Sequence, residues 1–234
     1  MREVISFLRK NFFKGLNVCT TVAEDMLFPK YCINCGRMLP VMQKLCVCDR
    51  CTEAVKKMVS VYDDERIGCK QIVSALKYDG KIRDAMLKFK FKNIKYLGYT
   101  FGKLLAETVK DRDFINKDTV ITAVPIHISR DREYNQSEVV ARHMCRELGI
   151  DYTDGVLFRI RPIKRLSSME LGDKEFFIKD SYMLNPCVNL CGKTVVIIDD
   201  VFTTGTTLRV VSREMKKYGA KEVYALTACY SKIQ

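Results

Sequence analysis

Two adjacent carboxylates and a threonine-rich loop stand together near the C-terminal end of the sequence, in the stretch VVIIDDVFTTGTT. The acids are Asp199 and Asp200, and the loop consists of Thr203, Thr204, Gly205, Thr206 and Thr207. Threonine hydroxyls and free backbone N–H groups at a helix start suit a phosphate monoester, and Gly205 lets the backbone approach the anion. The carboxylates would repel a phosphate, so we expect them to accept hydrogen bonds from paired sugar hydroxyls. Together the two features predict a site for a ribose 5-phosphate.

The same region predicts the elements that position this site. Residues 195–198 are β-branched throughout, which is typical of a strand buried on both faces in a parallel sheet. After the loop, apolar side chains recur at spacings of three and four up to Tyr218, and Gly219 stands where a helix-terminating glycine belongs. A second strand is expected over residues 222–228. The stretch is therefore one strand–loop–helix–strand unit of an α/β fold, in which ligands bind beyond the carboxyl ends of the strands.

The stretch from Val195 to Thr207 resembles the phosphoribosyl pyrophosphate (PRPP) signature of type I phosphoribosyltransferases. The resemblance implies a parallel-sheet domain that binds PRPP together with Mg²⁺, with the acids on the ribose and the loop on the 5-phosphate. A plainer alternative stays open. An Asp-rich turn could simply cap the following helix, with Thr203 or Thr204 as the N-cap residue.

A further strand is predicted over residues 118–124, between helices expected near 97–109 and from about 137 to 148. A second anion-binding loop would follow this strand and meet the pyrophosphate of PRPP; it begins with Val124, Pro125 and Ile126. Downstream, Arg130 and Arg132 alternate with acids, and arginine binds phosphate oxygens in bidentate fashion. We take these two arginines as candidate catalytic residues that stabilise charge, while a solvated charged loop would show the same pattern.

Eleven cysteines are present, and five of them fall between residues 32 and 51. Cys32 and Cys35 form one CxxC pair, and Cys48 and Cys51 form a second, which is the spacing of a four-cysteine zinc site in a reducing compartment. A closed set of four thiolates predicts a structural Zn²⁺. Two alternatives stay open: Cys46 could replace Cys48 as a ligand, and the thiols could be buried or redox-active.

The order of motifs along the chain resembles the ComF family of late-competence proteins of bacterial DNA uptake, together with the related GntX-type proteins. A four-cysteine knuckle comes first, then SALKYDGKIRDAMLKFKF, then VPIHISRDREYNQSEVVAR, and last the PRPP signature. The resemblance implies an N-terminal helix and zinc-ribbon domain over residues 1–60 and a phosphoribosyltransferase-like domain over residues 61–234. It also implies a role with imported single-stranded DNA, for which a DNA-uptake helicase is a possible partner.

The sequence departs from the family pattern in two places. Glu133 and Tyr134 stand where the family has Gly-Phe, so an acid replaces a glycine beside the expected pyrophosphate site. Downstream, the family's Thr-x-x-Gln…Arg…Asn pattern corresponds to Ile163, Leu166, Lys174 and Phe177. We therefore expect the PRPP half of the site to be intact, whereas the polar residues that would contact a second substrate are largely absent.

The chain carries a net charge of +12, which favours a polyanionic partner. The excess is concentrated in residues 77–95, where the alternation KFKFK predicts an extended strand with lysines on one face and phenylalanines on the other. We expect the rings to be buried and the lysines to contact single-stranded nucleic acid: Lys88, Lys90, Lys92 and Lys95. A second basic run could extend this surface, namely Arg159, Arg161, Lys164 and Arg165.

No uninterrupted apolar run approaches the ~20 residues of a membrane span, and the N-terminal stretch MREVISFLRKNFFKGLNV lacks the pattern of a signal peptide. We therefore expect a cytoplasmic protein.

Two functions are compatible with the sequence. In the first, a phosphoribosyltransferase displaces pyrophosphate from PRPP by positioning and charge stabilisation. In the second, the same fold is a non-catalytic nucleic-acid-binding adaptor, which the missing polar residues between 163 and 177 favour.

Overall fold

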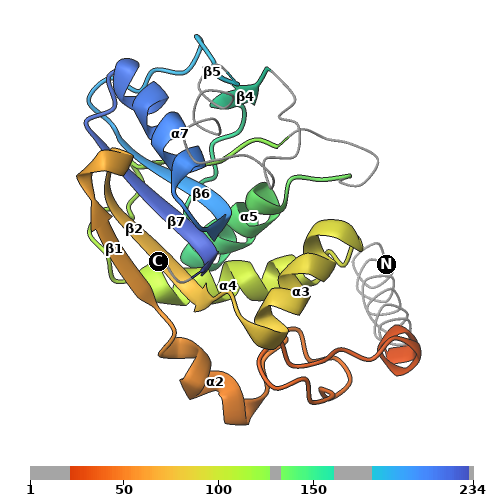
Figure 1. Cartoon of the computed structure of the whole chain (residues 1–234). Helices are drawn as coiled ribbons and strands as arrows, with labels where there is room; N and C mark the ends of the chain where they lie inside the picture. The colour runs from red at the N-terminus through yellow and green to blue at the C-terminus, as the bar shows by residue number, and fades with distance from the viewer. Residues whose placement is uncertain (1–21, 127–132, 161–180, 232–234) are drawn as a thin grey trace, which may run out of the picture.

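The computed structural model describes residues 22–126, 133–160 and 181–231. In chain order, the elements are α2 (Asp49–Lys56), β1 (Ser60–Asp64), η1 (Glu65–Ile67), β2 (Cys69–Lys77), α3 (Gly80–Phe91), α4 (Leu97–Val109), β3 (Val120–Ala123), α5 (Gln136–Leu148), β4 (Leu157–Arg159), β5 (Tyr182–Leu184), β6 (Thr194–Phe202), α7 (Thr206–Lys217) and β7 (Glu222–Tyr230) (Figure 1).

A five-stranded sheet with the order β1-β2-β7-β6-β3 forms the centre of the fold. The four strands from β2 to β3 pair in parallel, and β1 joins the edge antiparallel to β2. Strand β6 lies between β3 and β7, so both of its edges and both of its faces are covered. The predicted mostly parallel α/β sheet is therefore confirmed, and the acid pair belongs to one of its inner strands.

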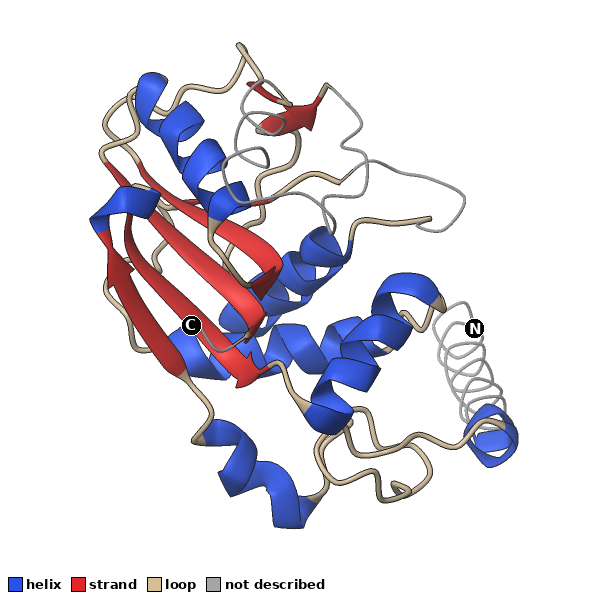
Figure 2. Cartoon of the chain, viewed as in Figure 1, coloured by secondary structure: helices blue, strands red, loops and turns tan. Residues whose placement is uncertain are grey.

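Helices cover both faces of the sheet (Figure 2). Val196 and Ile198 of β6 pack in one apolar cluster with α3, α4 and α5, whereas Val195 and Ile197 pack in a second cluster with α7 and the β4–β5 hairpin. This alternation follows from the period of two in a strand. Asp199 and Asp200 follow these four residues toward the carboxyl end of β6.

The cysteine-rich segment packs on the α3–α4 side of the molecule. Cys32, Ile33, Leu39 and Val55 belong to the same buried cluster as the apolar side chains of α3 and α4. The apolar core is therefore continuous across residue 60, where β1 begins. The division of the chain into residues 1–60 and 61–234 stays a prediction.

The prediction of an extended strand over residues 88–92 is wrong, because this segment is the last turn of helix α3. Its buried side chains recur at helical spacing along the whole helix: Ile82, Ala85, Met86 and Phe89. The Asp79 carboxylate caps the helix start by accepting from the Gly80 backbone N–H at 2.7 Å. Phe89 is fully buried as expected, but Phe91 is 49% exposed, so the two rings do not share one face.

The remaining predicted elements are confirmed with small changes of boundary. The helix over Leu97–Val109 has the expected ends, and α7 is followed by Gly219 with a positive φ of 86°. Strand β6 is longer than expected, because it continues through both acids to Phe202. Helix α7 begins at Thr206, so Thr206 and Thr207 belong to its first turn and not to the loop.

Candidate functional site

The acid pair lies at the carboxyl end of β6, where helices α3 and α5 also meet the sheet. Asp199 Oδ1 accepts hydrogen bonds from Ser137 Oγ at 3.2 Å and from the Asp200 backbone N–H at 2.8 Å. Ser137 lies in the first turn of α5, which follows the N-cap residue Asn135. Asp200 Oδ1 lies 2.8 Å from the Lys90 ammonium at the end of α3. Each acid therefore has its own partner from a different helix.

The two carboxylates differ in their electrostatic environment. Burial raises the pKa of Asp199 from its ordinary 3.8 to about 7, and repulsion from Asp200 adds to this effect. Asp200 is only 8% exposed but faces the positive charge of Lys90. A pair with one acid easily protonated and the other neutralised by a cation can hold two hydroxyls without carrying two uncompensated charges.

The threonine-rich loop leads directly into the N-terminus of α7. Gly205 is the N-cap residue, with a φ of 72°, and no side chain caps the helix. The alternative in which Thr203 or Thr204 serves as the N-cap is therefore wrong. Thr204 Oγ1 instead lies 3.0 Å from the hydroxyl of Thr206. A helix N-terminus with hydroxyls beside it and no capping side chain is a suitable environment for a phosphate.

The second predicted loop begins beside the acids. The Val124 backbone N–H donates to the Ile198 carbonyl at 2.9 Å, and the Val124 carbonyl accepts from Asn135 Nδ2 at 3.0 Å. Pro125 and Ile126 follow at the same edge of the sheet and are half-buried. His127, Arg130 and Arg132 lie outside the described residues, as do Ile163, Leu166, Lys174 and Phe177 and the basic residues Arg161, Lys164 and Arg165.

Glu133 interacts with Asn93, just after the end of α3. Its Oε2 atom accepts from Asn93 Nδ2 at 2.7 Å. The next residue, Tyr134, donates its hydroxyl to the Phe89 carbonyl at 2.5 Å, and its ring lies 5.5 Å from that of Phe89. Glu133 and Tyr134 therefore join the end of α3 to the start of α5.

Of the four lysines predicted to contact nucleic acid, Lys88, Lys92 and Lys95 are exposed, but Lys90 is not. Lys90 contacts Asp200, and sequence reasoning did not assign it to the acid pair. Ser137 was also missed, although the sequence Asn-Gln-Ser before an apolar helix is a recognisable helix start at the expected carboxyl edge of the sheet. Arg159 lies beside Tyr182, with its guanidinium carbon 5.8 Å from the ring centre.

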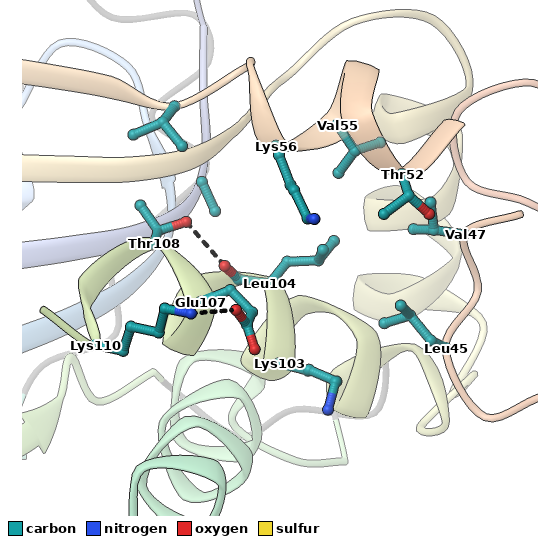
Figure 3. Close-up of a pocket in the computed structure, with 12 residues that line it drawn as sticks. Leu45, Val47, Thr52, Val55, Lys56, Lys103, Leu104, Glu107, Thr108 and Lys110 are labelled. Carbon is teal, nitrogen blue, oxygen red and sulfur yellow. Dashed lines mark hydrogen bonds and ion pairs between the residues drawn. The ribbon is translucent and has the colours of Figure 1, made fainter. Parts of the chain in front are cut away.

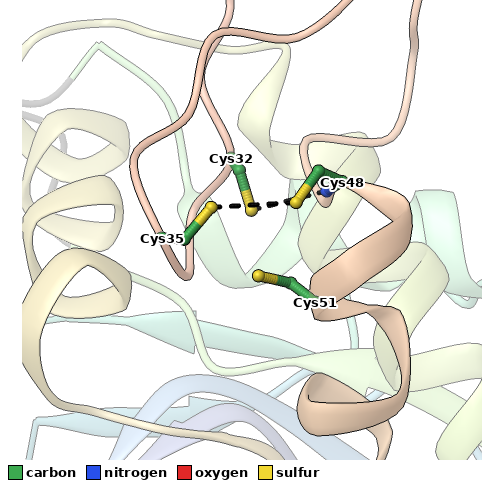
Figure 4. A group of neighbouring side chains, drawn as sticks. All are labelled: Cys32, Cys35, Cys48 and Cys51. Carbon is green, nitrogen blue, oxygen red and sulfur yellow. Dashed lines mark hydrogen bonds between the residues drawn. The ribbon is translucent and has the colours of Figure 1, made fainter.

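The four predicted metal-binding cysteines lie together at the knuckle (Figure 4). The Sγ atoms of Cys32, Cys35, Cys48 and Cys51 all lie within 4.8 Å of one another. Gly36 has a φ of 76°, and its N–H donates to the Cys32 carbonyl at 2.9 Å, which closes the tight turn. Four sulfurs that converge from two CxxC pairs are a ligand set compatible with a structural zinc site.

Backbone N–H groups around the cluster favour thiolates. The Cys48 N–H donates to Cys32 Sγ at 3.4 Å. Burial raises the pKa of Cys32, but hydrogen bonds from the backbone of Cys35, Cys48 and Asn34 outweigh this effect and lower it to about 7.

Cys46 is not part of this group. Its thiol is buried, its backbone N–H donates to Thr100 Oγ1 at 2.9 Å, and burial raises the pKa of its thiol. The four-cysteine cluster therefore includes Cys48 and not Cys46.

A cavity of about 470 Å³ lies between α2, the segment before it and α4 (Figure 3). Most of its lining is apolar, with Val47 and Val55 on the cysteine-rich side and Leu104 on α4. At its rim, Lys110 forms an ion pair with Glu107. None of the acid-pair or loop residues lines this cavity, so it is separate from the acid pair and the threonine-rich loop. Among the described residues, no helix has the length and apolar character to cross a membrane.

Comparison with known proteins connects these features. Residues 94–234 match the family model described as "Phosphoribosyl transferase domain". Competence protein F of Haemophilus influenzae is 27% identical over 142 residues, which cover 58% of this chain and 62% of that protein. Competence protein ComFC of Streptococcus pneumoniae is 25% identical over 186 residues, which cover 75% of this chain and 78% of that protein.

A solved structure, glutamine PRPP amidotransferase from B. subtilis, aligns with a TM-score of 0.40 at 19% identity; it covers 61% of this chain and 30% of that one. The chain spans less than two thirds of the length of the Haemophilus relative. The family match extends over more than half of the chain and includes the acid pair, the threonine-rich loop and α7. The protein therefore belongs to the phosphoribosyl transferase domain family, as a ComF-type member with a four-cysteine cluster ahead of the matched region.

Proposed function

We propose that this protein binds PRPP or ribose 5-phosphate with Mg²⁺ and acts in the competence-related uptake or handling of single-stranded DNA. The observation that carries the first part is the position of the acid pair. Asp199 and Asp200 lie at the carboxyl end of an inner parallel strand, and the next element is a helix whose N-terminus has no capping side chain. A sugar with paired hydroxyls and a terminal phosphate suits both features at once.

In this proposal, Asp199 and Asp200 accept hydrogen bonds from the ribose hydroxyls. The segment Thr203–Thr207 holds the 5-phosphate through hydroxyls and backbone N–H groups, and Val124, Pro125 and Ile126 begin the loop that meets the pyrophosphate. Arg130 or Arg132 would neutralise negative charge on the departing pyrophosphate, if the protein catalyses transfer of the pentosyl group. Mg²⁺ would enter with PRPP, held by phosphate oxygens and water, and would supply positive charge at the pyrophosphate.

Two further assignments belong to the same proposal. Cys32, Cys35, Cys48 and Cys51 would hold a structural Zn²⁺, because the converging thiols leave no position for a substrate. A site of reduced thiols is typical of a reducing compartment, so we propose that the protein acts in the cytoplasm.

The test is titration calorimetry with Mg²⁺–PRPP and with ribose 5-phosphate. We expect micromolar binding by the wild type and its loss in Asp199→Asn/Asp200→Asn. The chain offers a matched control, because Asp63 and Asp64 are also adjacent aspartates but lie on the edge strand β1. The variant Asp63→Asn/Asp64→Asn should bind as the wild type does. If the wild type gives no heat of binding with Mg²⁺–PRPP and none with ribose 5-phosphate, the proposal is wrong.

The single-stranded DNA part rests on the exposed lysines at the end of α3 and just after it. Lys88, Lys92 and Lys95 lie close together in sequence and are exposed, in a chain of net charge +12. Contacts to phosphates make binding fall steeply with salt, with a log–log slope of about −0.7 per phosphate contacted on single strands. The binding of a labelled oligonucleotide is measured by fluorescence anisotropy at several salt concentrations. The plot of log affinity against log salt concentration should be shallower for the variant with Lys88, Lys92 and Lys95 all replaced by alanine than for the wild type.

The two functions are separable by this design. An enzyme requires the acid pair, whereas a non-catalytic adaptor requires only the basic surface. If Asp199→Asn/Asp200→Asn keeps full oligonucleotide affinity and the wild type binds no PRPP, the adaptor is the correct function. If the wild type binds PRPP and releases pyrophosphate with an added nucleobase or nucleophile, the enzyme is correct.

A further inference from the structure

Lys90 differs from the other lysines of its basic run because it points into the acid pair. Its ammonium lies 2.8 Å from Asp200 Oδ1, and the two side chains are only 13% and 11% exposed. The lysines two positions away on either side, Lys88 and Lys92, are exposed. A lysine and an aspartate that exclude most of the water from their contact interact more strongly than a surface pair.

The backbone around Lys90 is fixed by the start of α5. The Lys90 carbonyl accepts from Gln136 Nε2 at 3.3 Å, and the neighbouring Phe89 carbonyl accepts from the Tyr134 hydroxyl at 2.5 Å. Gln136 is fully buried, and so is Phe89. The end of α3 is therefore held against the segment that carries Ser137, the partner of Asp199. The same junction positions the partners of both acids.

Several charged or titratable groups face Asp200 from the surrounding elements. They are Lys90 on α3, Asp199 on β6, Cys229 on β7, and Tyr182 on the β4–β5 hairpin, beside which Arg159 lies. Burial raises the pKa of Tyr182 to about 12 and also raises the pKa of Cys229, so both are neutral at neutral pH. Of the described cations in this set, Lys90 is the one in contact with an acid.

Lys90 contacts Asp200 through the Oδ1 atom of its carboxylate. The lysine thus neutralises the carboxylate without occupying both of its oxygens. We propose that Lys90 is a positioning residue, which compensates the charge of the Asp200 carboxylate and orients it so that the adjacent acids can bind the hydroxyls of one ribose. This inference rests on the proposed function of the acid pair.

The test compares Lys90→Ala and Lys90→Arg with Lys81→Ala, which changes an exposed lysine of the same helix. Binding of Mg²⁺–PRPP and of ribose 5-phosphate is measured by calorimetry between about pH 6 and about pH 8.5, a range that includes the raised pKa of Asp199, about 7. We expect Lys90→Ala to bind ~10-fold or more weakly at neutral pH, as for loss of a charge-assisted hydrogen bond. The deficit should grow toward low pH and shrink toward high pH.

Lys90→Arg should recover most of the affinity, and Lys81→Ala should follow the wild-type profile. A second measurement does not depend on a ligand. Because the charge of Lys90 lowers the pKa of Asp199, a carbon-13 NMR titration of the Asp199 carboxyl should show its midpoint at higher pH in Lys90→Ala than in the wild type. An equal loss at every pH, or an unchanged midpoint, would mean that Lys90 is merely structural and would overturn the inference.

The failure of the inference and the failure of the proposed function give different results. If wild type and Lys90→Ala bind PRPP equally well across the pH range, only the role of Lys90 is overturned. If neither the wild type nor Asp63→Asn/Asp64→Asn binds Mg²⁺–PRPP or ribose 5-phosphate, the proposed ribose phosphate site is wrong, and the proposed role of Lys90 is wrong with it.

Discussion

Gly205 and Ile67 lie so close together that a β-carbon on Gly205 would come within 2.6 Å of the Ile67 Cδ1 atom. Phe202 Cε2 would lie 3.1 Å from the same position. Ile67 belongs to η1, which connects β1 to β2 and packs against α7 in the second apolar cluster. The shape of the candidate phosphate loop is therefore fixed by a segment more than a hundred residues earlier in the chain.

Gly205→Ala should both destabilise the protein and weaken binding of Mg²⁺–PRPP. The φ of 72° costs an alanine about 1–2 kcal/mol, and overpacking against Ile67 adds about 1–3 kcal/mol. Gly149→Ala is the matched control, since Gly149 also has a positive φ, of 67°, but nothing lies within 4 Å of the added carbon. Urea unfolding should show the larger loss for Gly205→Ala. Equal losses in both variants would mean that the contact with Ile67 is unimportant.

The stability of the protein should depend on pH through Asp199. The pKa of this acid is raised from 3.8 to about 7 in the folded protein, so the folded state binds its proton more tightly than the unfolded state does. The folded state then holds the extra proton between these two values. Stability should fall as the pH rises from about 4 to about 7 and should change little above that, as far as this group is concerned.

Asp199→Asn should remove this dependence, because the amide does not titrate and its oxygen can still accept from Ser137. We expect the variant to gain up to about 4 kcal/mol over the wild type above neutral pH, because the pKa rises from 3.8 to about 7 and one pKa unit corresponds to about 1.4 kcal/mol. Thermal unfolding from about pH 4 to about pH 8 gives the comparison. The exposed Asp63→Asn serves as control, and parallel curves for all three proteins would show that Asp199 has an ordinary environment.

Most of the fold and part of the site follow from local patterns in the sequence. Four β-branched residues before Asp199 predict a buried strand wherever they occur, and the two CxxC pairs bring their sulfurs together because each pair forms its own tight turn. The end of β6 was placed too early, since polar residues usually mark a strand end, whereas here the pairing with β7 continues through Asp199 to Phe202.

The contacts that distinguish the site could not be predicted in this way. Lys90 and Asp200 are 110 residues apart and meet only because α3 packs beside the end of β6. The alternation of lysine and phenylalanine over residues 88–92 suggested a strand, but it is also compatible with the last turn of a helix. Over the longer window from Ile82 to Phe89 the spacing of apolar residues is helical, and this longer signal is the correct one.

The helical interpretation of residues 88–92 predicts different effects for the two phenylalanines. Phe89→Ala should lower the free energy of unfolding by about 3–5 kcal/mol, the usual cost of emptying a buried aromatic site. Phe91→Ala should cost no more than about 1 kcal/mol, because its side chain is half-exposed. Urea unfolding of the two variants checks this difference. Similar losses would mean that both rings face one buried surface, as in an extended strand.

The last prediction concerns the four-cysteine cluster and its metal. The purified protein should contain one zinc ion per chain, and Cys51→Ser should lose it, since removing one thiolate of four leaves an open and weaker site. Cys46→Ala is the control: its thiol is buried to a similar degree but lies outside the cluster, so the variant should keep its zinc at some cost in stability. Metal analysis after exposure to a chelator distinguishes the two.

Loss of zinc should also affect parts of the structure outside the four-cysteine cluster. Cys32, Ile33 and Val55 share one apolar cluster with α3 and α4, so a loosened cysteine segment exposes part of the core that supports Lys90. We therefore expect the metal-free protein to be cleaved first within residues 30–58 in limited proteolysis, and to bind Mg²⁺–PRPP more weakly. Retention of zinc by Cys51→Ser together with its loss from Cys46→Ala would assign the ligands differently. An unchanged PRPP affinity without metal would show that the cluster and the acid pair are independent.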